Sequence, residues 1–296
     1  MSPGETRVRL GLNRKKAKGG ALGAARMALR AIRRGTVAAA SLSLAAMGLL
    51  APAQADDGLP NLIARLTPSV VGVGAAYPVR VPTGGRAPRR FLGTGFVVSV
   101  GERSLIATNA HVIPDDLDVG GREQLAVFSG RGKTAAQRVA RLLLKDAVHD
   151  LALLEYEGSR LPAMQLATDG NARPGEHVAF TGFPIGAVLG LYPTTHDGII
   201  SAITPVARAA DRGRELSSVQ LRRLRDPFDV YQLDAIAYPG NSGSAVYRVG
   251  SGEVIGVMNS VFIKESKETL LSQPSAIAYA IPVRHLLKLL RELPAS

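Results

Sequence analysis

The chain has 296 residues, of which 46% are hydrophobic, and it carries a formal net charge of +12. This length and apolar content exclude a disordered chain and allow one large domain or two small ones around a substantial core. Cysteine is absent, which excludes disulfides, thiolate metal sites and a thiol nucleophile.

The positive charge is concentrated near the N-terminus. Residues 1–55 hold ten Lys or Arg residues and one acidic residue, Glu5, which leaves 26 basic and 23 acidic residues for the rest of the chain. A nearly neutral body does not require a polyanionic partner. We therefore predict no nucleic-acid partner.

Residues 1–55 have the layout of an export signal. A basic region ends at Arg33-Arg34, an apolar run extends from Val37 to Leu50, and Ala53-Gln54-Ala55 supplies small residues for cleavage. The apolar run is shorter than the roughly 20 residues that a membrane-spanning helix needs. We predict cleavage after Ala55, no stable membrane span afterwards, and a periplasmic or secreted location. A retained anchor and translation from Met27 are the alternatives.

The body of the chain is a series of short apolar or β-branched runs interrupted by Gly, Pro, Asn and Asp. This spacing is typical of an all-β sandwich or barrel, and it does not match alternating strands and helices. The predicted strands are residues 69–73, 95–100, 105–108, 125–128, 151–155, 178–181, 199–203, 230–233, 245–247, 254–258 and 277–281.

Helical patterning is confined to three places: a lead-in at 59–66, a basic amphipathic stretch at 214–225, and an apolar-striped segment at 283–293. A turn-rich stretch at 170–175 divides the strands into two groups of about six. We therefore predict one domain at 56–296, whose parts are a first barrel at about 67–169, a second barrel at about 175–282 and the C-terminal helix at 283–293.

Three polar residues occur in the order His, Asp, Ser. His111 follows an apolar run, Asp150 opens another, and Ser242 lies among glycines late in the chain. A serine hydroxyl is a weak nucleophile that needs a neighbouring base and a group that orients the base. The order predicts His111 as general base, Asp150 as its orienting carboxylate and Ser242 as nucleophile. Because Ser242 belongs to the second half, the site would form where the two halves meet.

The segment Pro239-Gly240-Asn241-Ser242-Gly243-Ser244 suits a tight turn. Glycines allow the main chain to turn so that amide groups converge on one point, where they can stabilise an oxyanion. We predict that the amides of Gly240 and Ser242 form the oxyanion hole. Taken alone, the segment would more simply be a turn that joins two strands.

Other polar residues fit catalysis less well. The Gly-x-Ser-x-Gly elbow of α/β-hydrolases requires a different order of the three residues and a strand-helix alternation that is not present. Three acids after His111 lack the spaced oxygen ligands of a calcium loop, so we predict no metal site and no cofactor. The remaining histidines are predicted to be surface or packing residues: His149, His177, His196 and His285.

Taken together, these segments resemble trypsin-like serine proteases, most closely the HtrA/Deg group. The resemblance covers most of residues 59–293, and it implies two antiparallel six-stranded β-barrels of chymotrypsin type with a C-terminal helix. It also implies the same roles for His111, Asp150, Ser242 and Gly240. The matching segments, in order, are 59–71, 93–98, 108–112, 150–154, 234–244 and 280–282.

The chain departs from the pattern of that group in four places. The sequence ends at Ser296, soon after the terminal helix, so we expect no peptide-binding PDZ domain. Ser244 replaces the second glycine, as in glutamyl endopeptidases of this fold. Asn241 stands where digestive proteases carry an Asp that pairs with a freed N-terminus, so we expect no activation by that route. The connection at 207–228 is long and basic, and it is either a regulatory or docking element or a solvated helix.

Specificity is predicted from the same resemblance. Ile236, six residues before Ser242, corresponds to the base of the first specificity pocket, and an apolar base disfavours Lys or Arg, which would bury an unpaired charge. The segment Val257, Met258, Asn259 and Ser260 corresponds to the strand that pairs with extended substrate backbone. We predict small or medium apolar side chains before the cut.

The sequence thus predicts an exported serine endopeptidase that acts on polypeptides through an acyl-enzyme. The alternative is a catalytically silent or activator-dependent protein that keeps the protease fold and binds unfolded polypeptides. The sequence favours the enzyme because all three chemical groups are present. It does not indicate an oligomeric state.

Overall fold

The computed structural model describes residues 58–76, 89–115, 117, 123–168, 172–184, 191–206, 218–259 and 277–294. The predicted export signal at 1–55 lies outside these ranges, as do Ser260 and the first part of the basic connection at 207–217.

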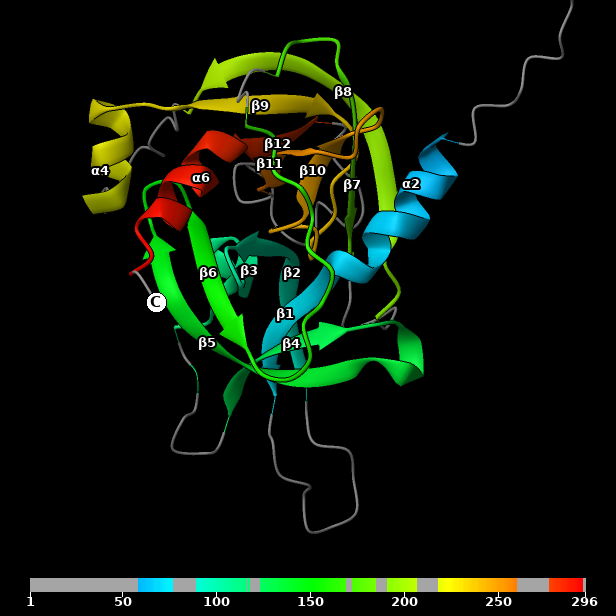
Figure 1. The fold of residues 1–296 in the computed structure, drawn as a ribbon. Helices are drawn as coiled ribbons and strands as arrows, with labels where there is room; N and C mark the ends of the chain where they lie inside the picture. The colour runs from blue at the N-terminus through cyan, green and yellow to red at the C-terminus, as the bar shows by residue number, and fades with distance from the viewer. Residues whose placement is uncertain are drawn as a thin grey trace, which may run out of the picture. The chain divides into compact units, whose positions relative to one another are not determined.

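The first half of the body forms a closed barrel in which all neighbouring strands are antiparallel. The order around the barrel is β1-β2-β3-β6-β5-β4 (Figure 1). Its strands are β1 (Val70–Ala76), β2 (Arg89–Val100), β3 (Arg103–Thr108), β4 (Gln124–Ser129), β5 (Ala136–Asp146) and β6 (Leu151–Tyr156).

The second half forms another closed antiparallel barrel, in the order β10-β11-β12-β9-β8-β7. Its strands are β7 (His177–Gly182), β8 (Thr194–Pro205), β9 (Asp229–Asp234), β10 (Ala245–Arg248), β11 (Val254–Met258) and β12 (Ile277–Pro282). The predicted fold of two six-stranded antiparallel barrels with a C-terminal helix is therefore confirmed.

The predicted helical stretches coincide with helices. They are α2 (Gly58–Leu66), α4 (Ser218–Arg225) and α6 (Val283–Arg291), and short 3-10 turns occur at η1 (Thr67–Ser69), η2 (Ala110–Val112) and η3 (Gly132–Thr134). Helix α6 ends two residues earlier than predicted, because the N–H groups of Glu292 and Leu293 bond to Leu289 and Leu290 in a tighter turn ahead of Pro294. None of the helices in the described ranges is long and apolar enough to cross a membrane.

One strand, β5, was not predicted from the sequence. Its eleven residues, Ala136–Asp146, have a mainly exposed or half-buried pattern with one fully buried position, Ala140. A strand whose side chains lie mostly at the surface does not show the apolar alternation by which strands are recognised. The pairing of β5 with β4 and β6 closes the first barrel all the same.

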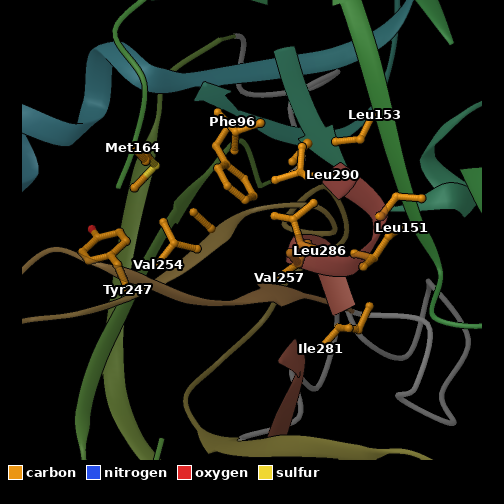
Figure 2. Packing of buried hydrophobic residues seen from close by; sticks show 14 of the residues in the cluster. Phe96, Leu151, Leu153, Met164, Tyr247, Val254, Val257, Ile281, Leu286 and Leu290 are labelled. Carbon is orange, nitrogen blue, oxygen red and sulfur yellow. The ribbon is translucent and has the colours of Figure 1, made fainter. Parts of the chain in front are cut away.

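An apolar core joins the two barrels and α6 (Figure 2). Phe96 and Leu153 of the first barrel, Val257 and Ile281 of the second, and Leu286 of α6 belong to one buried cluster. Each such side chain stabilises the fold by roughly 1.5–3 kcal/mol when it is removed from water. In a chain without disulfides, this shared core is what fixes one barrel against the other.

The connection between the barrels bonds to both of them. The N–H of Met164 donates to Val97 O of β2 at 2.9 Å, and the N–H of Ala167 donates to Val254 O of β11 at 2.9 Å. The N–H of Val254 donates in return to Gln165 O at 2.8 Å. The catalytic candidates therefore come from two barrels whose relative position is set by main-chain bonds as well as by apolar packing.

Candidate active site

His111 lies in the short turn η2, which directly follows β3. The end of β3 is tied to β2, since Thr108 Oγ1 donates to Thr94 O at 2.6 Å. The N–H of Ala110 then donates to Asp150 O at 3.1 Å. These bonds bring the His111 backbone beside the turn that ends in Asp150.

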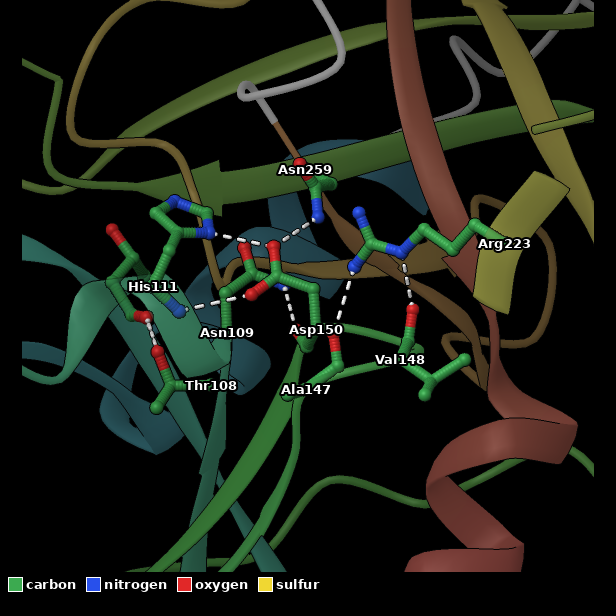
Figure 3. Close-up of polar contacts among 9 residues, drawn as sticks. Thr108, Asn109, His111, Ala147, Val148, Asp150, Arg223 and Asn259 are labelled. Atoms are coloured by element: carbon green, nitrogen blue, oxygen red, sulfur yellow. Dashed lines mark hydrogen bonds and ion pairs between the residues drawn. The ribbon is translucent and has the colours of Figure 1, made fainter. Parts of the chain in front are cut away.

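The carboxylate of Asp150 holds His111 by two bonds (Figure 3). The His111 N–H donates to Oδ1 at 2.9 Å, and Nδ1 of the imidazole bonds to Oδ2 at 2.6 Å. An ionised carboxylate only accepts, so Nδ1 carries the hydrogen and Nε2 is the basic nitrogen of the neutral ring. This is the tautomer that a general base toward a serine hydroxyl requires.

The backbone of Asp150 has an unusual conformation. Its φ is 56°, and it is the single non-glycine residue with a positive φ within the described ranges. Asp tolerates the left-handed region better than most residues, but the conformation still has an energetic cost and persists only when the surroundings hold it. Here Asn109 Nδ2 donates to Asp150 O at 3.0 Å, and the residue is only 7% exposed.

Asn259 completes the environment of the carboxylate. Its Nδ2 donates to Asp150 Oδ2 at 2.6 Å, across the junction between the barrels. Sequence reasoning assigned Asn259 to substrate binding and missed this contact. The available signal was a polar residue directly after the apolar strand β11, at a position that proves fully buried.

Ser242 lies in a turn that precedes β10, and it is 3% exposed. Three main-chain N–H groups of this turn donate hydrogen bonds to other main-chain carbonyls. Asn241 donates to Tyr238 O at 3.0 Å, Gly243 to Met258 O at 2.9 Å and Ser244 to Asn241 O at 3.0 Å. Of these three residues, Asn241 lies between Gly240 and Ser242, whose N–H groups the prediction assigns to the oxyanion hole, and Gly243 and Ser244 follow them.

Thr94 of β2 holds the same turn from the first barrel. Its N–H donates to Ser242 O at 2.8 Å, and its Oγ1 donates to Gly240 O at 2.7 Å. The same Oγ1 accepts the N–H of Phe183 at 3.0 Å. Thr94 therefore holds the carbonyls on both sides of the Asn241–Ser242 peptide unit, and this restricts the orientation of that unit.

Two glycines are required by this close approach. Gly243 has a φ of 87°, and a Cβ there would lie 2.0 Å from Thr94 O. A Cβ on Gly93 would lie 2.6 Å from Val112 Cγ2 and 2.9 Å from Ser242 O. Gly93 therefore lies between the main chain of Ser242 and Val112, so the predicted nucleophile turn (239–244) and the predicted base turn (110–112) approach each other here.

The two unusual neighbours of Ser242 are buried beneath the turn. Asn241 and Ser244 are both fully buried. Within the described part of the chain, neither polar atom of the Asn241 carboxamide nor the Ser244 hydroxyl has a hydrogen-bond partner. A Cβ on Gly182 would lie 2.3 Å from Ser244 Oγ and 2.9 Å from Asn241 Oδ1, so both side chains pack closely against Gly182.

The residues predicted to bind substrate differ from one another in their exposure to solvent. Ile236 is 40% exposed, whereas Ala235 and Ala237 on either side of it are buried. Val257 and Met258 are fully buried and pair with β10 and β12 inside the second barrel. The Asn259 N–H donates to Tyr279 O at 2.8 Å. Ser260, the last residue of this set, lies outside the described ranges.

The other histidines have surface and packing roles, as predicted. His149 bonds through Nδ1 to Asp146 Oδ2 at 2.6 Å and stacks on His285 with ring centroids 4.1 Å apart. His196 stacks on Phe180 at 5.2 Å, and the exposed His177 pairs with an acidic side chain of β8. Among the residues described, no group of three or more His, Asp or Glu side chains could hold a metal ion.

Burial and local bonds shift two pKa values near the Asp150 turn. Burial raises the pKa of Asp146, but the hydrogen bonds from the His149 ring and from the N–H groups of His149 and Val148 outweigh it and lower that pKa to about 2. Burial, and then the neighbouring His149 ring, lower the pKa of His285 to about 3. Asp146 is therefore charged and His285 neutral at pH 7.

The sequence matches a family model described as "Trypsin-like peptidase domain" over residues 93–257. Among curated proteins, it is 30% identical over 246 residues to "Serine protease HTRA3" of Homo sapiens. This match covers 82% of this chain and 47% of that protein. It is 32% identical over 199 residues to "Probable periplasmic serine endoprotease DegP-like" of Halomonas elongata. This match covers 66% of this chain and 33% of that protein. The chain thus spans less than half the length of these relatives.

Solved structures give the same fold. "HtrA-type protease AlgW with decapeptide" has a TM-score of 0.55 and 25% identity, and the match covers 79% of this chain and 66% of that one. The Rv3671c protease from M. tuberculosis in its active form has a TM-score of 0.56 and 21% identity, with 82% and 88% covered, and shows the fold alone. With the two barrels and the model match, the chain belongs to the trypsin-like peptidase family, and within it resembles HtrA-type serine proteases.

Proposed function

We propose that the chain is a serine endopeptidase that hydrolyses peptide bonds through His111, Asp150 and Ser242. The observation that carries the proposal is the fixed His111–Asp150 pair beside a nucleophile turn whose carbonyls Thr94 holds. In a protein of trypsin-like fold this arrangement serves acyl transfer.

In the proposed mechanism, Ser242 Oγ attacks the carbonyl carbon of the scissile bond while His111 Nε2 takes its proton. The Asp150 carboxylate stabilises the imidazolium that results, through the bond to Nδ1. The amides of Gly240 and Ser242 would stabilise the negative charge that develops on the carbonyl oxygen. His111 then protonates the leaving amine, and water hydrolyses the acyl-enzyme by the same steps in reverse order.

The proposed substrates are polypeptides with small or medium apolar side chains before the cut. Support comes from Ile236, whose side chain is 40% exposed and offers no charge to pair with Lys or Arg. The main chain of Met258 already bonds to Gly243 and Ser244. The N–H of Asn259 bonds to Tyr279 O as well, so pairing with substrate backbone is proposed for Ser260, the last residue of this segment. A peptide-library profile dominated by Arg or Glu would overturn this specificity.

We further propose that the protein is exported and acts in the periplasm or outside the cell. The support is the layout of residues 1–55. The name of the Halomonas elongata relative describes that protein as periplasmic. Sequencing the N-terminus of the exported protein tests cleavage after Ala55, and an intact N-terminus ahead of Asp56 would contradict it.

The decisive experiment is labelling of the folded protein with a fluorophosphonate. We expect an adduct on Ser242 and loss of peptidase activity in Ser242→Ala, with an unchanged far-ultraviolet circular dichroism spectrum. An unlabelled Ser242, or a Ser242→Ala variant with wild-type activity, would reject the proposal. Binding of an unfolded polypeptide without cleavage would favour a catalytically silent binding protein.

A further inference from the structure

The turn between β5 and β6 is where the first barrel presents Asp150. Its strained residue, with a φ of 56°, comes last in the turn, so the path of Ala147, Val148 and His149 decides where the carboxylate points. From within the first barrel, Asp146 Oδ1 accepts the N–H groups of Val148 and His149, both at 3.0 Å. These bonds fix the N–H groups of the turn.

The carbonyls of the turn are fixed by a residue far away in sequence. Arg223 Nε donates to Val148 O at 2.6 Å, and Arg223 Nη2 donates to Ala147 O at 2.9 Å (Figure 3). Arg223 lies in α4, in the connection between β8 and β9 of the second barrel. The guanidinium is a planar fork, so it holds two successive carbonyls in one fixed relation, which a single ammonium group cannot do.

Only part of the basic helix is involved. Arg223 is half-buried, whereas Arg222 and Arg225 on the same helix are exposed. The prediction left open whether this stretch is a solvated helix or a regulatory element. Within the described part of the helix, Arg222 and Arg225 are solvated, as expected for a surface helix, whereas Arg223 reaches the Asp150 turn.

Further packing sets the position of α4 against the turn. Phe228, three residues after the helix, lies with its ring centroid 4.7 Å from that of His149 and 5.1 Å from that of His285. The Phe228 carbonyl accepts the N–H of Val206, the residue directly after β8, at 2.8 Å. The end of the helix is therefore anchored beside the same turn that Arg223 holds.

From this geometry we infer that Arg223 is a positioning residue: by fixing the carbonyls of Ala147 and Val148, it keeps Asp150 in the conformation that orients His111. The inference rests on the proposed function for its catalytic consequence. It makes α4 a structural link between the β8–β9 connection and the catalytic carboxylate. Displacement of α4 would therefore change the orientation of Asp150 and His111 without any change at Ser242.

The test compares Arg223→Ala with Arg222→Ala, which removes an exposed arginine from the same helix. Misplacement of a catalytic group by about 1 Å can cost on the order of 100-fold in rate. For Arg223→Ala we expect kcat to fall by roughly 10- to 100-fold with KM nearly unchanged, and Ser242 labelling to slow in parallel. Arg222→Ala should match the wild type. Arg223→Lys, which keeps the charge and the apolar stem, should be intermediate and preserves a folded protein for comparison.

Two further measurements separate positioning from general destabilisation. The proton on His111 Nδ1, bonded to Asp150, is expected to give a low-field NMR resonance in the wild type that is lost or broadened in Arg223→Ala. This signal does not depend on activity, so it tests the inference even if Ser242 fails to react. In an Asp150→Asn background, Arg223→Ala should cause no further loss of kcat. Wild-type kcat and an unchanged resonance in Arg223→Ala, or an equal loss in Arg222→Ala, would overturn the inference.

Discussion

The Asn259 carboxamide donates a hydrogen bond of 2.6 Å to Oδ2 of Asp150, the same oxygen that bonds to His111 Nδ1. The first barrel supplies Asp150 and the second supplies Asn259. The orientation of the carboxylate therefore depends on how the barrels are joined.

This contact predicts the effect of Asn259→Ala. A hydrogen bond to a charged group contributes about 1.5–3 kcal/mol, and its loss frees the carboxylate to turn away from His111. We expect kcat to fall by roughly 10- to 100-fold, in line with 1.4 kcal/mol per tenfold, with a smaller change in KM. Steady-state kinetics on a peptide substrate measure this. The control is Asn61→Ala, which removes an exposed carboxamide from α2; equal losses in both variants would contradict the prediction.

Thr94→Val tests the support of the nucleophile turn. The substitution keeps the shape but removes the hydroxyl that donates to Gly240 O and accepts from the Phe183 N–H. Leaving such buried groups unpaired costs about 1–3 kcal/mol each, so we expect a lower free energy of unfolding and a slower reaction of Ser242 with fluorophosphonate. Thr134→Val, at an exposed site, should change neither quantity. Wild-type labelling of Thr94→Val would show that the turn holds its shape without this hydroxyl.

Gly93→Ala tests the contact between the two turns. The added methyl group would lie 2.6 Å from Val112 Cγ2 and 2.9 Å from Ser242 O, so the nucleophile and base turns must separate. We expect overpacking to cost about 1–3 kcal/mol in unfolding free energy and kcat to fall. Chemical denaturation and kinetics measure the two effects. Gly250→Ala serves as control because a Cβ there meets no atom within 4 Å; the prediction fails if both variants behave alike.

The pH dependence of stability is predicted from His285. Burial and the His149 ring lower its folded-state pKa from 6.5 to about 3. Asp146 raises that pKa, while Arg284 and Lys288 lower it further. Between these two pKa values the unfolded chain binds a proton that the folded chain does not bind, so stability is lost as the pH falls below 6.5.

We expect this residue to lower the free energy of unfolding by on the order of 2 kcal/mol between pH 7 and 4.5. Burial also lowers the pKa of His196, which adds to the slope in the same direction. His285→Phe keeps an aromatic ring against His149. It should reduce the pH dependence of the free energy of unfolding by the contribution of His285, as measured by urea unfolding at several pH values. An identical slope in His285→Phe and the wild type would refute the assignment.

Much of the fold could be predicted because the buried strands carry their own signal. Strands such as β1 and β11 are fully buried and read as unbroken apolar runs. The surface strand β5 lacks that signal and was missed. The chemical groups of the site were also recognisable, since a base, a carboxylate and a serine between tight-turn residues follow one another in a known order.

The supporting residues of the site could not be predicted in the same way. Thr94, Asn259 and Arg223 are ordinary polar residues in sequence, and each acts on a partner from the other barrel. A hydrogen bond forms only when the fold brings donor and acceptor within about 3 Å of each other. Nothing in the spacing of 75 residues between Val148 and Arg223 indicates that approach.

The fold class follows from the sequence, and the sequence also proposes the reactive groups, because apolar periodicity and residue chemistry are properties of the chain. How His111 and Asp150 are held, and which residues support them, became apparent only from the folded structure. The reason is physical: the orientation of a buried carboxylate depends on donors from both barrels, and their positions are fixed only when the shared apolar core has formed.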